Sequence, residues 1–391
     1  MARGSASPLA VATHESTESL RSRLARRHLE QTVFDESPPV VVKSRAPRRP
    51  IPRDLLVLTL FCVGFVAIAE VLSRAIGAPF VLPAGESPAL GTHFSWPVIA
   101  ALTGYATLQI YSAVTGSHRE GRDAWTRNLI TDLYLVSLFI IVTYVHFHIK
   151  MWVPLINPRN YDASYFAVDN RLRFLIEGLR PIRHAIASVL PAPDLWYALA
   201  FFSMFSLSFW FHAAGRRTWH YHNMVAITLT ELLGPLLYLV APAVGPFLFE
   251  RGDNPVATAA QLHMYGEYSA LQATGVTWLQ QHGGEYFTAP LAAMPSLHFA
   301  ATCVLAYYAV RARLVIAPLV VALLCWIGIE SIVSRWHYLV DLPAGLGVAL
   351  VTIAFANRIC RHRLEEKSPV PVTGDFAREG WRVAQPERWR A

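Results

Sequence analysis

The chain has 391 residues, of which 53% are hydrophobic and only 16% are charged, and its mean hydropathy is +0.33. This composition excludes an ordinary soluble globular protein of that length. The formal net charge of +7 requires no nucleic-acid partner, because basic residues beside membrane spans set orientation and meet anionic lipid headgroups. The sequence therefore predicts an integral membrane protein.

The N-terminal segment, residues 1–53, differs from the rest in being rich in Arg, Ser, Pro and Glu. It has no apolar stretch ahead of a small-residue cleavage site, so it does not read as a signal peptide. We expect a disordered basic cytoplasmic tail whose default partner is the anionic lipid surface.

Apolar stretches that could cross a bilayer, which takes about 20 helical residues, follow the tail. The eight candidates are Leu55–Ile76, Trp96–Val114, Leu129–Val153, Leu195–Ala214, Met224–Phe247, Ser296–Val310, Leu314–Val333 and Tyr338–Ala356. The second is interrupted by polar residues and the sixth is short. They predict an all-α, polytopic membrane helix bundle with about eight transmembrane helices. Its parts are two additional N-terminal helices in 54–125, a six-helix membrane domain in 126–358 and a cytoplasmic C-terminal tail in 359–391.

Lys and Arg cluster in the N-terminal tail, after the second, fourth and sixth spans, and at the C-terminus. All five clusters lie on one side of the membrane if eight spans alternate, and the positive-inside rule makes that side the cytoplasm. Both termini are then inside, and two long loops, from about Lys150 to Asp194 and from about Phe249 to Pro295, are outside.

The four cysteines show no paired spacing, and all fall in or at the ends of the predicted spans. They are Cys62, Cys303, Cys325 and Cys360. This distribution argues against both a disulfide framework and a zinc cage.

Two polar sites face the outer side of the predicted bundle. Ser296 and His298 begin the sixth span, where the unpaired N–H groups of a helix N-terminus attract anions, and we favour the backbone N–H of Ser296 over its hydroxyl as a phosphate donor. His337 and Asp341, four residues apart, begin the eighth span and would share one helical face. A carboxylate there can fix the imidazole tautomer and activate the histidine as a nucleophile or base.

Each of these polar residues also has a structural interpretation. A histidine at a span end can serve as an interfacial hydrogen-bonder, and Lys150 and Arg251, which could neutralise a phosphate, could equally snorkel to the headgroups. A zinc site built from both histidines and Asp341 is conceivable, but the sequence has no HExxH motif and no fourth ligand at suitable spacing.

The segments "PSLH" at 295–298 and "HYLVD" at 337–341 resemble the paired motifs of the type 2 phosphatidic acid phosphatase superfamily. The resemblance covers roughly 126–357. More narrowly, "HYLVD", "YLVAPAVGP" and "LINPRNYDASYFAVDNRL" are similar to the branch that includes inositol phosphorylceramide synthases and related bacterial proteins.

The resemblance implies a phosphohistidine mechanism without a metal ion or other cofactor. His337 would attack phosphorus, Asp341 would orient and stabilise it, and His298 would protonate the leaving oxygen. The implied partners are a phospholipid or lipid phosphate substrate and a lipid or polyol acceptor, and the implied location is the bacterial inner (plasma) membrane with the active site on the outer face. The oligomeric state stays open.

The sequence departs from the superfamily pattern at the positions where the motifs have arginine or lysine. Ser331 stands where the superfamily has an arginine six residues before the nucleophilic histidine, and the nearby arginine is Arg335. The Lys-x6-Arg-Pro motif has a counterpart in "RFLIEGLRP", with Arg173 and Arg180, but this lies before the fourth span. Loss of the arginine-rich motifs is typical of the phosphotransferase branch.

Three functions remain open at this stage. The favoured one is a lipid phosphotransferase that moves a phospho-headgroup. The second is a lipid or polyprenyl phosphate phosphatase with the same triad and water as the acceptor. The third is a proton-coupled transporter. Two features argue against it: the sequence has no internal repeat, and its ionisable residues lie at one edge of the membrane.

Overall fold

The computed structural model describes residues 52–86, 93, 95–114, 122–215 and 217–365. Within these ranges the chain is helical and forms no strand; an isolated bridge joins Glu86 to His93. The predicted all-α fold is confirmed. Except for its last two residues, the predicted N-terminal tail lies outside the described residues, as does the predicted C-terminal tail beyond residue 365.

The described chain consists of helices along most of its length. Their bounds are α2 Arg53–Ile76, α3 Trp96–Val114, α4 Arg122–Ile156, α5 Asp162–Arg171, α6 Arg173–Ala187, η1 Pro193–Leu195, α7 Trp196–Gly215, α8 Arg217–Tyr238, η2 Pro246–Leu248, α9 Pro255–Thr274, α10 Val276–Tyr286, α11 Leu297–Arg311, α12 Ala317–Val333, α13 Asp341–Ile359 and α14 Arg361–Glu365.

Each predicted span corresponds to a helix, namely α2, α3, α4, α7, α8, α11, α12 and α13. Four helices of the described chain are long and apolar enough to cross a membrane: Arg53–Ile76, Ala124–Ile156, Pro193–Ala214 and Asp341–Ile359. Val98–Tyr111 and Ala317–Val333 are shorter apolar helices. An integral membrane protein follows from these helices.

The fifth predicted span was placed too far toward the C-terminus. Its helix, α8, ends at Tyr238, and the apolar residues up to Phe247 form a turn and the 3₁₀ helix η2. Pro242 lacks the N–H that a helix would need, and Gly245 has φ 148°, a conformation that disfavours residues with a side chain. The polypeptide therefore leaves the bundle at a point that hydropathy does not mark.

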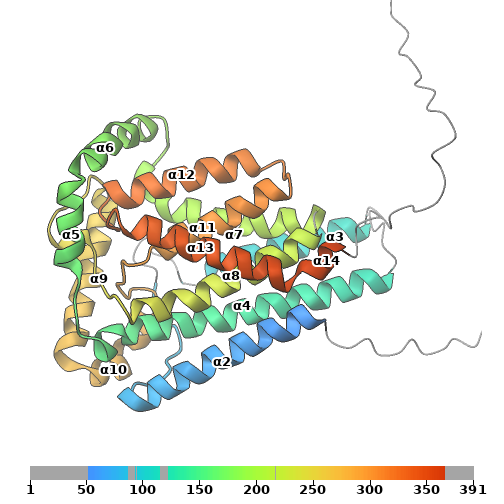
Figure 1. Ribbon diagram of the computed structural model, residues 1–391, viewed down its shortest axis with the longest axis horizontal. Coiled ribbons are helices and arrows are strands. Elements are labelled where there is room, and N and C mark those ends of the chain that lie inside the picture. The colour runs from blue at the N-terminus through green and yellow to red at the C-terminus, as the bar shows by residue number, and fades with distance from the viewer. Residues whose placement is uncertain (1–51, 87–92, 94, 115–121, 216, 366–391) are drawn as a thin grey trace, which may run out of the picture. The chain divides into compact units, whose positions relative to one another are not determined.

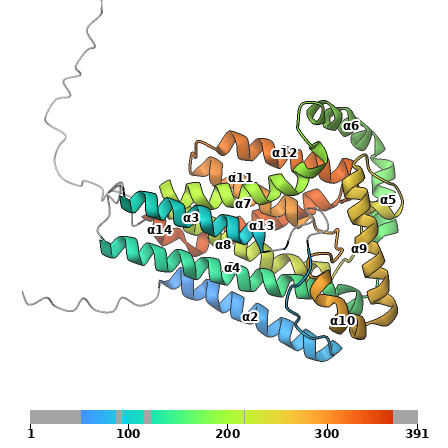
Figure 2. The same ribbon diagram turned by 180° about the vertical axis from the view of Figure 1, so that it is seen from behind.

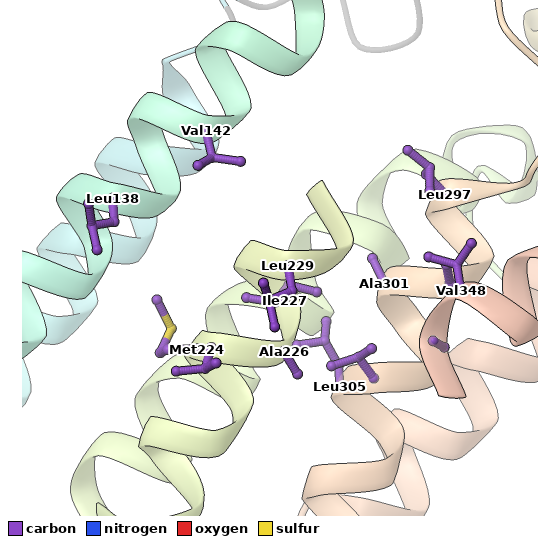
Figure 3. Packing of buried hydrophobic residues seen from close by; sticks show 14 of the residues in the cluster. Leu138, Val142, Met224, Ala226, Ile227, Leu229, Leu297, Ala301, Leu305 and Val348 are labelled. Atoms are coloured by element: carbon purple, nitrogen blue, oxygen red, sulfur yellow. The ribbon is translucent and has the colours of Figure 1, made fainter. Parts of the chain in front are cut away.

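Helix α8 lies at the centre of the bundle, where it packs against α4, α7, α11 and α13. Figure 3 shows this core, with Leu138 and Val142 of α4, Met224, Ala226, Ile227 and Leu229 of α8, and Leu297 and Leu305 of α11. Small residues let the helices approach closely, as is usual in membrane bundles. A Cβ on Gly234 of α8 would lie 2.0 Å from the Leu297 side chain, which begins α11.

Helices α5, α6, α9 and α10 gather at one end of the bundle, whereas α14 and the α11–α12 connection lie at the other (Figure 1). The view from behind shows the same arrangement (Figure 2). These four helices come from the two long loops that the sequence places outside. The N-terminus of α11 and the turn before α13 meet them at that end.

Candidate active site

The turn between α12 and α13 presents His337. The backbone N–H groups of Trp336 and His337 both donate to the Ser331 carbonyl, over 3.0 and 3.1 Å, which folds the turn back on the end of α12. Arg335 has φ 58°, in the left-handed region that is uncommon for a residue other than glycine. Such strained positions cluster at functional sites.

His337 and Asp341 are in contact. The imidazole Nδ1 lies 3.2 Å from Asp341 Oδ2 and 2.9 Å from the carbonyl oxygen of Ala293. The sequence explained this pair by a shared helical face, whereas α13 begins only at Asp341 and His337 lies in the preceding turn. The Tyr338 N–H also donates to Asp341 Oδ2, over 2.8 Å, and this holds the carboxylate in the turn.

The contacts of Nδ1 fix the tautomer of neutral His337. A carbonyl oxygen can only accept a hydrogen bond, so Nδ1 must carry the proton that it shares with Ala293. The lone pair of the neutral ring is then on Nε2. His337 is buried, and Asp341 is fully buried with no hydrogen-bond partner on Oδ1 among the described residues. This arrangement provides an oriented nucleophile backed by a desolvated carboxylate.

His298 lies in the first turn of α11, which Ser296 caps. The Ser296 hydroxyl oxygen accepts the N–H of Phe299 over 3.4 Å. The imidazole packs edge-on against Phe201 of α7, and its Nδ1 lies 3.3 Å from the hydroxyl of Tyr197. Helix α7 therefore holds one ring nitrogen of His298 and leaves Nε2 for other partners.

The two histidine segments are joined through the backbone. The Ser296 N–H donates to the Asp341 carbonyl over 3.1 Å, and a Cβ on Gly345 would lie 2.4 Å from the Ser296 carbonyl oxygen. Lys150 and His337 are close enough to His298 for their charges to act on it. The structure thus brings the two histidines and Asp341 to one place. The Ser296 N–H that we favoured as a phosphate donor is already in use, which leaves the hydroxyl.

Helix α5 clamps the His337 turn with two carboxylates seven residues apart on one face. Asp162 accepts the Tyr338 hydroxyl over 2.6 Å and the N–H groups of Val244 and Gly245, each over 2.8 Å. Asp169 accepts the Leu339 N–H over 2.9 Å. Both carboxylates are buried.

Arg335 is fully buried and bonded through one nitrogen, Nη2, which donates to Asp169 over 2.9 Å. Its Nε and Nη1 are buried and have no hydrogen-bond partner among the described residues. Burial raises the pKa of Asp169, although the Leu339 N–H and the charge of Arg335 act in the opposite direction. The three N–H groups on these two nitrogens of a buried cation are costly to leave unsatisfied unless a ligand accepts from them.

The other predicted cations have different surroundings. Arg173 donates to both oxygens of Glu250, over 2.6 and 2.5 Å, and Arg180 donates to the same carboxylate over 2.9 Å. Both guanidinium groups are therefore already paired with the Glu250 carboxylate. Arg251 is exposed to solvent.

Lys150 extends from α4 into the bundle, with its Nζ 5.6 Å from the ring centre of Tyr238. One turn earlier on α4, His146 Nδ1 contacts Glu231 of α8, 3.1 Å from Oε2. No carboxylate lies within 4.0 Å of Lys150 among the residues that the structure describes. Lys150 is therefore a half-buried cation without an ion-pair partner among the described residues.

Sequence reasoning missed the residues that hold the histidines in place. Tyr197 begins a span beside an aromatic run, and nothing in its neighbourhood marks it. Asp162 and Asp169 carried a weak signal, because their spacing places two carboxylates on one face of a helix in an outer loop. The Ala293 carbonyl could not be found from residue types at all.

One of three comparisons with known proteins gave a match. Residues 166–355 match the family model of the PAP2 superfamily. Neither the search of curated proteins nor that of solved structures gave a match. The matched range contains His298, His337 and Asp341. The match supports the PAP2 superfamily for this part of the chain, and with it an enzyme of the phosphatase type.

Proposed function

We propose that the chain is an integral membrane lipid phosphotransferase that moves a phospho-headgroup through a phosphohistidine intermediate. The observation that carries this proposal is the geometry of His337. Its Nδ1 is bonded to the Ala293 carbonyl and to Asp341, so its Nε2 is the nucleophilic atom. His298 supplies an imidazole from the neighbouring helix as acid and base. The substrate is a phospholipid or lipid phosphate.

In the first half-reaction, His337 Nε2 attacks phosphorus and the bond from phosphorus to the leaving oxygen breaks. His298 enters as the imidazolium and gives its Nε2 proton to that oxygen, which leaves a neutral ring. The Tyr197 hydroxyl oxygen, 3.3 Å from His298 Nδ1, can accept the Nδ1 proton and so keep it there, with the lone pair on Nε2. Asp341 offsets the positive charge that the His337 ring gains. Acid–base catalysis of this kind is worth about 10²–10⁴-fold in rate.

In the second half-reaction, His298 Nε2 takes the proton of an acceptor hydroxyl, whose oxygen attacks phosphorus. The bond from phosphorus to His337 Nε2 breaks, and both histidines return to their starting protonation. A lipid or polyol acceptor gives a transferase and water gives a phosphatase. Neither half-reaction needs a metal ion.

We propose that Arg335 and Lys150 are the main cations that neutralise the negative charge of the phosphoryl group. Arg335 is buried beside the nucleophile and has two nitrogens without a partner among the described residues. Lys150 is half-buried and has no carboxylate within 4.0 Å among the described residues. The Ser296 hydroxyl adds a donor at the N-terminus of α11. Arg173, Arg180 and Arg251 are left as residues that could meet the headgroup outside the site.

We further propose that the site faces the outer side of a bacterial inner membrane and that both termini are cytoplasmic. The basic clusters in the tails and inner loops support this orientation. The helices α5, α6, α9 and α10 then cover the outer end of the bundle.

Purified protein in nanodiscs, supplied with a headgroup-labelled phospholipid, tests the proposal. Diacylglycerol, ceramide or inositol is added as the acceptor. A new labelled lipid supports the transferase, and label released only as the free phospho-headgroup supports the hydrolytic reaction with water as the acceptor. No turnover with any donor, while the protein moves protons across a sealed vesicle, would support a transporter instead.

The matched variants are His337→Ala, His298→Ala and His263→Ala. His263 is an exposed histidine on α9 and serves as the control. We expect the first two to abolish product formation and the third to retain it. Asp341→Asn should lower turnover far more than it weakens substrate affinity.

A further inference from the structure

Helix α6 is strongly amphipathic. Its charged face is turned toward the protein and its apolar face outward, which is the reverse of the orientation of a surface helix on a soluble protein. At 3.6 residues per turn, Phe174, Leu175 and Ile182 share one face of α6, and Arg173 and Arg180 lie on the other. A surface helix of a soluble domain turns its apolar face toward the protein and its charges toward water.

The charged face of α6 is turned toward the rest of the protein. Arg173 and Arg180 share Glu250, as described above. Arg183, which is buried, donates to Asp194 over 2.6 Å and to Glu330 of α12 over 3.1 Å. The three arginines are thus held by carboxylates of the chain itself.

The apolar face of α6 is uncovered. Phe174 is 68% exposed, Leu175 43% and Ile182 46%. No described helix packs over these side chains, although Ile176, on the opposite face, is fully buried. In water, three such residues exposed on one helix would be unfavourable, because apolar surface is more stable when it is removed from water.

The uncovered face continues into a membrane-crossing helix. The chain passes from α6 through Val189, which is 78% exposed, to Leu195 of η1 and Leu199 in the first turn of α7, which are 36% and 39% exposed. The span Pro193–Ala214 is long and apolar enough to cross a membrane. The exposed apolar side chains of α6 are therefore followed along the chain by exposed apolar residues where this span begins.

We propose that α6 is a lipid-inserted helix, with Phe174, Leu175 and Ile182 in the acyl chains of the leaflet at this end of the bundle. Its arginine face is the anchor to the protein, and its apolar face is the surface that the lipid covers. Amphipathic helices of this kind lie in the plane of the interface with their apolar face about 5–10 Å into the boundary between headgroups and acyl chains. The proposal does not depend on the reaction assigned to the histidines.

Acyl chains fit this surface better than a second protein chain does. The apolar face has no charged side chain among its exposed residues that could orient a protein partner, and the chain leads from it directly into a membrane span. A second protein chain could cover this surface only if the apolar face of α6 and the start of α7 were both withdrawn from the lipid.

The test uses full-length protein with single cysteine labels in phospholipid vesicles. Cys303 and Cys325, which are not fully buried, are first changed to Ser, and the buried Cys62 and Cys360 are kept. An environment-sensitive fluorophore (NBD) is then attached at Phe174→Cys, at Ile182→Cys and, as the control, at His184→Cys. His184 lies on the charged face, and its side chain is 60% exposed.

We expect the emission at positions 174 and 182 to shift to the blue and to be quenched by brominated phosphatidylcholine, and not by iodide in the buffer. The control at 184 should show the opposite pattern. Equal iodide quenching at all three positions would overturn the proposal. So would emission at position 174 that is insensitive to brominated lipid while the Phe174→Cys variant cross-links two copies of the chain. Leu175→Cys replaces any variant that does not elute as a single folded species.

Discussion

The Tyr338 hydroxyl donates to Asp162 Oδ1 over 2.6 Å, so a carboxylate from the outer helix α5 holds the residue that follows His337. The same carboxylate accepts the N–H groups of Val244 and Gly245. One side chain thus connects the backbone between α8 and η2 to the turn that carries the proposed nucleophile. A contact between residues so distant in sequence makes the position of His337 a property of the whole fold.

Asp162→Ala should therefore lower both stability and turnover. It leaves three donors without their acceptor, and each buried donor left unpaired costs roughly 1–3 kcal/mol. Thermal unfolding in detergent and kcat with the labelled lipid measure the two effects. Tyr338→Phe removes one of the three hydrogen bonds and should have the smaller effect on both. A variant Asp162→Ala with the kcat and unfolding temperature of the wild type would contradict the clamp.

The contact between α11 and α13 gives a prediction with a control in the same helix. A Cβ on Gly345 would lie 2.4 Å from the Ser296 carbonyl oxygen, whereas nothing lies within 4 Å of a Cβ on Gly347. Gly345→Ala must push the N-terminus of α11, and His298 with it, away from Asp341. We expect a large loss of kcat for Gly345→Ala and little change for Gly347→Ala. Equal activity of the two variants would show that this packing does not set the distance between the histidines.

Tyr197→Phe should lower turnover by about two- to tenfold, because a neutral hydrogen bond contributes about 0.5–1.5 kcal/mol. The loss should be in kcat and not in KM, since Tyr197 touches His298 and not the substrate. The pH profile of kcat should also change, because the hydroxyl helps to determine which nitrogen of His298 is protonated. Tyr265→Phe on α9, a partly exposed tyrosine, is the control. An unchanged pH profile would argue against this positioning role.

The ion pairs of Glu250 predict a pH dependence of stability. Burial opposes the ionised form, but the hydrogen bond from Arg173 and the charges of Arg335, Arg173 and Arg180 prevail and lower the pKa of Glu250 below its ordinary value of 4.5. The folded protein therefore binds this proton less readily than the unfolded chain does. The stabilisation is fully present above pH 4.5 and is lost as the pH falls through the lower folded pKa.

Glu250→Gln isolates this effect. The wild type should unfold at a higher temperature than Glu250→Gln at pH 7, and the difference should shrink as the pH is lowered below about 4.5. Thermal unfolding in detergent at several pH values measures it. A difference that stays constant down to about pH 3 would mean that the carboxylate is not the titrating group.

Hydropathy predicted the helices well where an apolar stretch ends at a charged residue. The start of α2 at Arg53 and the end of α12 near Arg335 are examples. It failed at α8, since the residues from Leu239 to Phe247 are apolar but their proline and glycine residues end the helix. Backbone chemistry, and not side-chain polarity, decides that boundary.

The candidate site was predictable where its partners are neighbours in the sequence. The spacing of His337 and Asp341 was enough to pair them. The Arg335–Asp169 pair joins residues 166 positions apart, and the Ala293 carbonyl that orients His337 belongs to the backbone. Such contacts follow from how α5 and the segment before α11 pack, and no local pattern encodes them.

The most direct measurement is a search for phosphate on His337. Purified protein is incubated briefly with phosphorus-labelled substrate, quenched and digested, and the label is located by mass spectrometry. The account predicts acid-labile, base-stable phosphate on His337 Nε2 in the wild type and in His263→Ala, and none in His337→Ala. Label on another residue, or an active His337→Ala enzyme, would contradict it.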